Sequence, residues 1–457
     1  MMEFVNEYLP IIMFLSLAGL LFTGYPVAFI LGGLAVLFGL IGHGIGDFKL
    51  IEYFNFMPRI WGMAAENLVL VAVPTFVFMG TMMERSGIAN EMLYCCQVLL
   101  RRVPGALALA VTVMGTILAA MTGIIGASVT MMTALALPVM LRQGYAQTLS
   151  TGVIAASGTL GILIPPSIML IIMADLLSIS VGTLFTSAIV PGLLLASLYL
   201  IFVISWASVK PDIAPKLPPE LLFVPSNEMA PLLFRGFFPP VILIGMIKGS
   251  ILLGWATPSE AGAVGCFGAM VIAAFKGTLK WDVIKGVCQS SGLTIAMIFF
   301  IVMSATCFAY VFRSLGGDDV VEELILEAGF GSWGLLFLIM SIVFFLGFFL
   351  DWVEITLIVL PVFAPLVVGL NFEGHVPEAM KVYWFTVLVA INLQTSFLTP
   401  PFGFALFYMK GIAPKEVDIK NIYLGIIPFV LIQCSGVIMV LFWPNIALWL
   451  PGLVYAN

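Results

Sequence analysis

The sequence contains few charged side chains. Asp, Glu, Lys and Arg together make up 9% of the 457 residues, whereas they make up about a quarter of a typical soluble domain. So few charges cannot coat the surface of a soluble globule of this length. The composition therefore excludes a cytosolic enzyme, a nucleic-acid-binding protein and a disordered chain.

Histidine and cysteine patterns argue against an enzyme in the membrane. The two histidines, His43 and His375, are far apart and each lies beside glycine. An intramembrane protease or acyltransferase would need an HExxH pair, a catalytic histidine or a Ser/Lys dyad. The six cysteines have no metal-site spacing and form no recognisable disulfide framework. We therefore expect a protein that is not an enzyme and has no catalytic residues.

Long apolar stretches dominate the chain. Hydrophobic residues make up 62%, and the mean hydropathy is +1.17. At about 20 residues for each crossing, this length allows roughly a dozen membrane spans. We predict an all-α polytopic membrane protein. The runs without Asp, Glu, Lys or Arg are 8–46, 103–141, 143–174, 176–209, 286–312, 328–350, 382–409 and 421–457.

Four landmarks recur in the same order in the two halves of the chain. They are Arg85-Ser86 with Arg313-Ser314, Pro138 with Pro361, Pro165-Pro166 with Pro400-Pro401, and Pro191 with Pro428. Chance pairing among the 27 prolines is the alternative. Internal duplication is typical of secondary transporters. We predict a first repeat half at 1–206, a proline-rich linker at 207–228 and a second repeat half at 229–457.

The segment 104–141 carries a glycine-containing turn, 123–128, between two apolar stretches. Counting the second stretch as the 14 residues 128–141 gives about 21 Å of helix, which is short of the roughly 30 Å membrane core. This predicts a re-entrant hairpin, with an ordinary tight turn between two spans as the alternative. A tip inside the membrane could offer carbonyls to a cation and a helix N-terminus to an anion.

Each double proline predicts a break in a helix at membrane depth. Proline lacks the N–H group and disfavours helical geometry in the preceding residue. We predict broken helices at 146–176 and 380–410, whose freed carbonyls could bind Na⁺. A structural kink is the alternative, but recurrence in both halves favours a function.

A second hairpin is predicted at 332–370, with Asp351 and Glu354 at its tip. A buried carboxylate is costly without a cation, so Asp351 is a candidate Na⁺ ligand. A solvent-exposed loop carboxylate is the alternative. Four further polar residues are candidates for lining a substrate cavity. The alternatives are a charge that snorkels at a helix end, for the aspartate, and polar residues that hold helices together, for the other three. The four are Asp175, Asn392, Gln394 and Thr395.

At these residues the sequence resembles the large membrane subunit (M, DctM-like) of the tripartite ATP-independent periplasmic (TRAP) transporters. The resemblance runs from near the start to near the end of the chain. The matching stretches are residues 24–29 (GYPVAF), 73–80 (VPTFVFMG), 123–128 (GIIGAS), 158–167 (GTLGILIPPS), 184–185 with 190–192, 256–261 (ATPSEA) and 398–403 (LTPPFG).

The resemblance implies inverted repeats with two hairpins and two broken helices, forming an elevator-type transport domain beside a scaffold. It also implies two Na⁺ sites and a substrate carboxylate between the tips. The implied partners are a small four-helix membrane (Q) subunit and a periplasmic substrate-binding (P) protein. The expected Na⁺ ligands are Gly126, Ser128, Gly161 and Pro165, and then Gly347, Asp351 and Thr399. The expected substrate contacts are Ser128, Thr130, Asp175, Asn392, Gln394 and Thr395.

The first tip departs from one branch of this family. Sialic acid transporters carry a tip of the type SGSxxAD, whereas residues 126–130 read GASVT here. The tip is similar instead to the branch associated with 2-oxoacids and mannitol/chloroaromatic types. We predict Na⁺-coupled import of a small organic acid across the inner membrane of a bacterium. The alternative is an ion- or proton-coupled carboxylate transporter that works without a binding protein.

Overall fold

The computed structural model describes residues 2–21, 23–216, 226–327, 329–372, 374–400 and 403–455. These ranges contain helices and their connections and no β-strand. Eight helices within them are long and apolar enough to cross a membrane, judged by length and composition. The predicted all-α polytopic class is therefore confirmed. The eight are Val27–Ile45, Ile125–Arg142, Val181–Val209, Met229–Leu252, Pro258–Phe275, Trp281–Ser314, Trp352–Gly369 and Ile419–Phe442.

The first part of the chain contains ten α-helices and three short 3-10 turns within the described ranges. They are α1 (Met2–Leu21), α2 (Val27–Ile45), η1 (Leu50–Asn55), α3 (Phe56–Ala64), α4 (Ala72–Arg85), α5 (Ile88–Leu99), α6 (Ala106–Thr122), α7 (Ile125–Arg142), α8 (Gln147–Thr159), η2 (Leu160–Ile162), α9 (Ile168–Leu176), α10 (Val181–Val209) and η3 (Pro211–Ile213). The predicted linker 207–228 overlaps the end of α10, which continues to Val209, and the start of α12 at Ser226. Residues 217–225 lie outside the described part.

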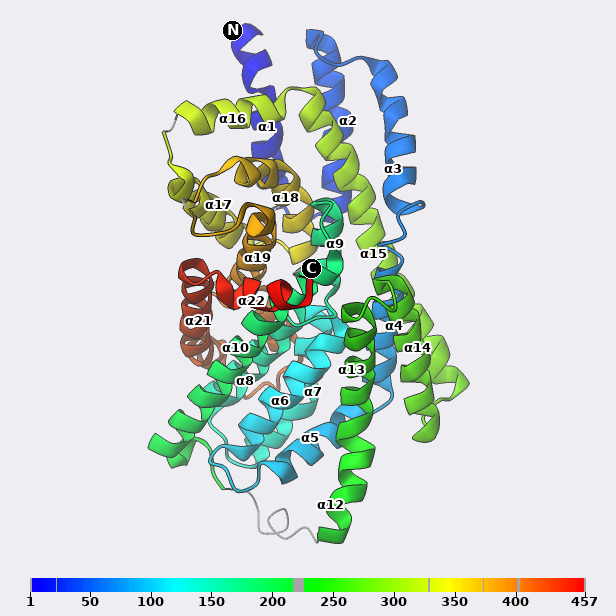
Figure 1. Ribbon diagram of the computed structural model, residues 1–457, viewed down its shortest axis with the longest axis vertical. Coiled ribbons are helices and arrows are strands. Elements are labelled where there is room, and N and C mark those ends of the chain that lie inside the picture. The colour runs from blue at the N-terminus through cyan, green and yellow to red at the C-terminus, as the bar shows by residue number, and fades with distance from the viewer. Residues whose placement is uncertain are drawn as a thin grey trace.

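The second part begins with α12 and ends with α22. Its elements are α12 (Ser226–Leu232), the π-helical turn η4 (Leu233–Phe237), α13 (Phe238–Leu252), α14 (Pro258–Phe275), α15 (Trp281–Ser314), α16 (Gly317–Glu327), α17 (Ser332–Leu346), α18 (Trp352–Gly369), η5 (Glu378–Met380), α19 (Lys381–Leu398), α20 (Phe404–Ile412), α21 (Ile419–Phe442) and α22 (Asn445–Tyr455). In Figure 1 the N-terminus and α16 lie at one end of the long axis, and α12 lies at the other.

The same order of elements occurs twice. In each half a helix ending in Arg-Ser precedes a short helix, a helical hairpin, a broken helix and a long helix, which gives α4–α10 and then α15–α21. Arg85 donates from Nη2 to Ser290 Oγ (2.7 Å), near the start of α15. Its counterpart Arg313 lies 23 residues further along α15, about 35 Å away. Equivalent residues therefore sit at opposite ends of the molecule, as inverted repeats require.

Helices of the two halves interlock around a buried core. Helix α8 packs against α21, and α10 packs against α19. The hairpin helix α7 packs on α20, and α18 packs on α9. A Cβ added at Gly152 would collide with the backbone of Gly425, so α8 and α21 need glycine at this crossing. All residues 149–159 and 384–398 are buried, which places α8 and α19 at the centre.

A second group of helices lies along one side of this core. Helix α15 packs against α2, α3 and α4, and α14 packs against α4 and α13. Figure 1 shows α2, α3 and α15 on the upper right of the molecule and α13 and α14 below them.

The second helix of the first hairpin is longer than the sequence indicated. Helix α7 has 18 residues rather than the expected 14, because it begins at Ile125, directly after the turn. Its length of about 27 Å is closer to the roughly 30 Å membrane core than the expected length of about 21 Å, although it remains shorter.

The two ends of the molecule differ in charge. Hydrogen bonds bring several element ends together at one end, since Asn421 donates to Gln147, and the Ala146 amide donates to Ile213. Most of the 18 lysines and arginines lie at or next to the elements of this end, which we name the basic end. They are Arg85, Arg101, Arg102, Arg142, Lys210, Lys216, Arg235, Lys276, Lys280, Lys285, Lys410, Lys415 and Lys420.

Candidate functional site

The first hairpin turns within a few residues. Helix α6 ends at Thr122, Gly123 adopts φ +61°, and Ile124 is extended. A Cβ added at Gly123 would lie 3.1 Å from Ile168 Cγ1 and 3.3 Å from the Ile168 backbone nitrogen. The turn therefore needs glycine for its φ angle and for this approach. It places the first tip beside the start of α9, just after the first helix break.

The first tip also touches the other broken helix. A Cβ added at Gly126 would lie 3.0 Å from Cζ of Tyr408, which belongs to α20. The Ser128 hydroxyl donates to the Ile124 carbonyl (3.0 Å), and the Thr130 hydroxyl donates to the Ala127 carbonyl (3.0 Å). The hydroxyls thus bond to their own helix, while the tip backbone lies between the two breaks.

The first break frees a buried backbone carbonyl from the helical hydrogen-bond pattern. In a continuous helix the amides at positions 165 and 166 would donate to Gly161 and Ile162, but both positions are proline. The Ser167 hydroxyl donates to the Ile162 carbonyl instead (2.7 Å). No hydrogen bond from another described residue ends on the Gly161 carbonyl. The Pro165-Pro166 peptide bond is cis.

A close contact between hairpin and break occurs in both halves. A Cβ added at Gly161 would collide with the Ala119 carbonyl of α6. A Cβ added at Gly347 would collide with the Ser396 side chain of α19. Gly347 lies 228 positions after Ala119, which is the offset of the Arg-Ser landmarks. Ser396 lies 235 positions after Gly161, which is the offset of the double prolines. The contact is therefore duplicated, with the glycine on the break in one half and on the hairpin in the other.

The second tip carries carboxylates. Asp351 is the N-cap of α18, and its Oδ1 accepts from the Trp352 amide (2.8 Å). Glu354 Oε2 accepts from the Asp351 amide (3.1 Å), which completes a capping box. No lysine or arginine in the described ranges forms an ion pair with either carboxylate. Two carboxylates without a basic partner, next to a tightly packed break, form a donor set suited to a cation.

The second break is described on its N-terminal side. Helix α19 ends at Leu398, and Thr399 becomes extended while its hydroxyl donates to the Thr395 carbonyl (2.8 Å). Helix α20 begins after Gly403. Pro401, half of the predicted double proline, lies outside the described residues.

The two broken helices meet at one side-chain contact. Gln394 donates from Nε2 to Thr159 Oγ1 (3.3 Å), and both side chains are fully buried. The two residues are 235 positions apart, which is the offset of the double prolines, so they are repeat equivalents. Gln394 Oε1 is buried and has no hydrogen-bond partner among the described residues. The contact therefore marks where the repeats face each other.

The remaining polar candidates have structural partners. Asn392 donates from Nδ2 to the Met340 carbonyl of α17 (2.7 Å), which ties α19 to the second hairpin. The Thr395 hydroxyl donates to the Ile391 carbonyl of its own helix (2.8 Å).

Asp175 lies in a different place from the other candidates. Asn67 donates from Nδ2 to Asp175 Oδ2 (2.7 Å) at the end of α9. The two residues line a cavity of about 320 Å³ together with Arg59, Tyr310 and Arg313. None of the other predicted site residues lines this cavity.

Three residues at the site were not among the sequence candidates. They are Thr159, Ser396 and Tyr408. Applying the repeat offset of 235 to Gln394 and Gly161 would have pointed to Thr159 and Ser396. No sequence signal indicated that Tyr408 covers the first tip.

Comparisons with known proteins agree with this architecture. The sequence matches the family described as "Tripartite ATP-independent periplasmic transporter, DctM component" over residues 14–446. It is 28% identical to the C4-dicarboxylate TRAP transporter large permease protein of Rhodobacter capsulatus, covering 97% of this chain and 99% of that protein. It is 29% identical to the ectoine/5-hydroxyectoine TRAP transporter large permease protein of Ruegeria pomeroyi, with the same coverage.

The crystal structure of the Alcanivorax borkumensis YdaH transporter, described as having an unusual topology, resembles this fold. The TM-score is 0.57 at 16% identity, covering 87% of this chain and 89% of that chain. That likeness supports the fold alone. The two sequence relatives are named as permeases rather than enzymes, in agreement with the expectation of no catalytic site. With the match covering residues 14–446, the chain belongs to the DctM component family of the tripartite ATP-independent periplasmic transporters.

Proposed function

We propose that the chain is the large permease subunit of a Na⁺-coupled importer of small organic acids. Two kinds of finding support this. The family is a transporter component, and relatives named as C4-dicarboxylate permeases cover nearly the whole chain. The sites described above offer separate surroundings for a cation and for an anion.

One observation carries the proposal. The Gln394–Thr159 hydrogen bond joins equivalent residues of two interrupted helices at the centre of the molecule. The Gly161 carbonyl, which accepts no hydrogen bond from the described residues, lies two positions after Thr159, and α18, which begins at the tip with two carboxylates, packs on α19. In a membrane-spanning protein such backbone must face protein or water, which makes the region a natural ligand site.

The substrate carboxylate fits the first tip. Helix α7 begins at Ile125, and its N-cap residue Ile124 makes no side-chain capping hydrogen bond. The amide groups and the helix dipole at such an end attract an anion. Ser128 and Thr130 lie in the first turns of α7, and the buried Gln394 amide lies on the facing broken helix. Asn392 and Thr395 lie on the same helix, whereas Asp175 would act at the separate cavity.

Sodium fits the carbonyls and carboxylates of the tips and breaks. The first ion would bind among Gly126, Ser128, Gly161 and Pro165, where the double proline frees the Gly161 carbonyl. The second would bind among Gly347, Asp351 and Thr399, where it would offset the charge of Asp351 and Glu354. Cation binding would lower the negative potential that opposes an entering carboxylate, which couples the two ligands.

Movement of one helical body past another would complete transport. The hairpins α6–α7 and α17–α18 pack with the broken helices into one interlocked unit. Helices α2, α3, α4 and α15 pack along its side, so an elevator movement of the unit against them would expose the site on alternate sides. A small four-helix membrane subunit and a periplasmic binding protein would complete the transporter.

The charge distribution orients the chain in the membrane. Lysines and arginines favour the cytoplasmic side, and most of them lie at the basic end. We therefore place the basic end in the cytoplasm and α16 at the periplasmic face of the bacterial inner membrane.

Uptake into proteoliposomes tests the proposal. The chain, its small membrane subunit and its binding protein would be supplied with radiolabelled succinate or the acid found in a ligand screen on the binding protein. Uptake driven by an inward Na⁺ gradient at equal pH supports the proposal. Uptake sustained by a pH gradient alone, or without the binding protein, supports the alternative transporter class instead.

A further inference from the structure

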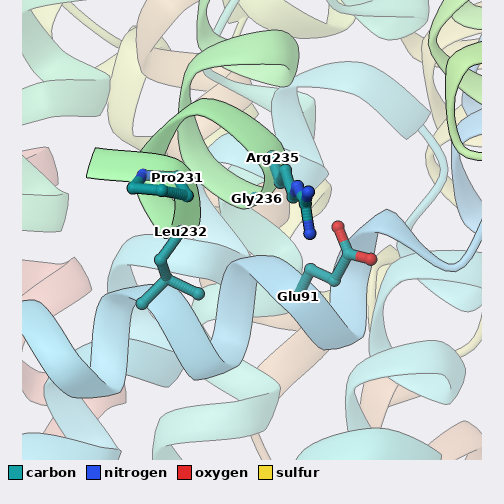
Figure 2. Close-up of a pocket in the computed structure, with 5 residues that line it drawn as sticks. All are labelled: Glu91, Pro231, Leu232, Arg235 and Gly236. Atoms are coloured by element: carbon teal, nitrogen blue, oxygen red, sulfur yellow. The ribbon is translucent and has the colours of Figure 1, made fainter. Parts of the chain in front are cut away.

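A recess opens on the outer surface where α5, η4 and the end of α14 meet. It consists of two adjoining pockets of about 370 and 450 Å³ that share Glu91 and Arg235. Figure 2 shows the Arg235 side chain extending from η4 toward the carboxylate of Glu91 on α5. The recess lies away from the hairpin tips and at the basic end, so transport chemistry does not account for it.

The backbone holds this recess in shape. A Cβ added at Gly236 would lie 2.9 Å from the Glu91 carbonyl oxygen, so η4 rests directly on α5. The turn η4 is π-helical, a form that occurs often at functional sites. Because Gly236 permits this contact, the neighbouring Arg235 is kept beside Glu91.

The recess has a surplus of positive charge. Lys276 Nζ lies 3.0 Å from Glu91 Oε2, and its side chain is only 15% exposed. Lys276 therefore neutralises Glu91, and Arg235 contributes one further positive charge. An arginine fork next to an ammonium group suits a phosphate group.

The remaining wall is apolar and exposed. Phe234 is 69% exposed and Phe275 is 90% exposed, and both line the larger pocket with Pro239 and Ile272. Phe234 lies in the candidate membrane span Met229–Leu252, and Phe275 ends the candidate span Pro258–Phe275. Phenyl rings this exposed on candidate spans suit contact with the hydrocarbon of the bilayer, so the recess pairs a charged floor with a surface that can take acyl chains.

We propose that this recess binds the headgroup of an anionic phospholipid from the leaflet at the basic end. Arg235 and Lys276 donate hydrogen bonds to the phosphate, and the acyl chains lie along Phe234 and Phe275. Basic pockets between membrane helices on the cytoplasmic side bind such headgroups. A free phosphate ion would make no use of the exposed phenyl rings, which is why a lipid is favoured.

Native mass spectrometry of the purified chain tests the proposal. Phosphatidylglycerol and phosphatidylcholine of equal chain length would be titrated against the detergent-solubilised protein. We expect phosphatidylglycerol to bind more tightly, and Arg235→Gln or Lys276→Gln to weaken its binding about fivefold each, equivalent to about 1 kcal/mol. Arg235→Lys keeps the charge and should retain most of the affinity.

The matched control is Lys280→Gln, which removes an exposed basic residue near the same end that does not line the recess. Equal binding of the two lipids, or an Arg235→Gln variant with unchanged binding, overturns the proposal. So does inorganic phosphate that displaces the lipid at millimolar concentration, since the site would then be a simple anion site. Loss of the lipid when the small membrane subunit is co-purified would assign this face to a protein partner instead. Melting temperatures without added lipid identify any variant that fails to fold.

Discussion

The two hairpin tips stand at equivalent places in the duplicated fold but carry opposite chemistry. In the first, the N-cap of α7 is Ile124, which supplies no side-chain hydrogen bond. In the second, the N-cap of α18 is Asp351, and Glu354 completes a capping box. The backbone pattern is repeated, whereas the charge is not.

On the proposed function, this difference between the tips bears on where each ligand binds. A helix N-terminus whose N-cap residue carries no polar or charged side chain keeps more of its partial positive charge, which attracts an anion. Two carboxylates at the other tip more than cancel the helix dipole and attract a cation. On the proposed function, the acid and the first Na⁺ would bind at the first tip and the second Na⁺ at the second tip. The predictions below make the tips more alike or separate them further.

The largest effect is expected from giving the first tip the charge of the second. Ile124→Asp adds a favourable N-cap and so should not unfold the hairpin. Its carboxylate would oppose a substrate carboxylate about 5 Å away by about 3 kcal/mol, so uptake at limiting substrate should fall by more than about a hundredfold. Reconstituted uptake measures this.

Ile124→Ser serves as the control, because it caps α7 without adding charge. It should keep far more activity than Ile124→Asp. Equal activity in the two variants would mean that the first tip does not bind the anion.

The second largest effect is expected from removing the charge of Asp351 at the second tip. Asp351→Asn retains a good N-cap but replaces a charged oxygen ligand by a neutral one. The Na⁺ concentration for half-maximal uptake should rise roughly thirtyfold, which is about 2 kcal/mol. Asp318→Asn removes an exposed carboxylate from α16 and should leave the Na⁺ dependence unchanged. An unaltered Na⁺ dependence in Asp351→Asn would leave Asp351 as a helix cap only.

Breaking the hydrogen bond between the two broken helices should have a smaller effect on uptake. Gln394→Leu and Thr159→Val each remove one partner of the central hydrogen bond. Each should raise the KM for substrate about fivefold, and the double variant should be little worse than either single variant. A coupling energy near 1 kcal/mol is expected in this cycle. Fully additive losses would show that the two side chains act independently.

The smallest effect is expected at Glu354, the other carboxylate of the second tip. Glu354→Gln keeps an oxygen that can accept from the Asp351 amide, so the capping box is retained. Because only the charge is lost, the Na⁺ concentration for half-maximal uptake should rise roughly twofold. A Glu354→Gln effect larger than that of Asp351→Asn would exchange the roles of the two carboxylates.

Much of the architecture could be predicted because its signals are local. Two adjacent prolines cannot donate the hydrogen bonds of a helix, so Pro165 and Pro166 indicate a break in any context. The recurring pairs Arg85-Ser86 and Arg313-Ser314 indicated a duplication, and the order of helices in the structure repeats in the same way. The length of α7 was underestimated because Ile124 is not a residue type that signals a helix start.

Contacts between distant segments could not be predicted in this way. Hairpin and break approach each other at Gly161 in one half and at Gly347 in the other, so the small residue changes sides. The ring of Tyr408 covers Gly126 only because α20 packs on α7. Such contacts join residues far apart in the sequence, so the pattern of residues along one helix cannot predict them.

Direct measurement of Na⁺ binding tests the central claim most sharply. Radioactive ²²Na⁺ binding to the purified complex would be measured with and without the substrate acid, in the unaltered protein and in Asp351→Asn. The account predicts that substrate tightens Na⁺ binding in the unaltered protein and that Asp351→Asn loses most of this binding. Equal Na⁺ binding in the two proteins, with no response to substrate, would contradict it.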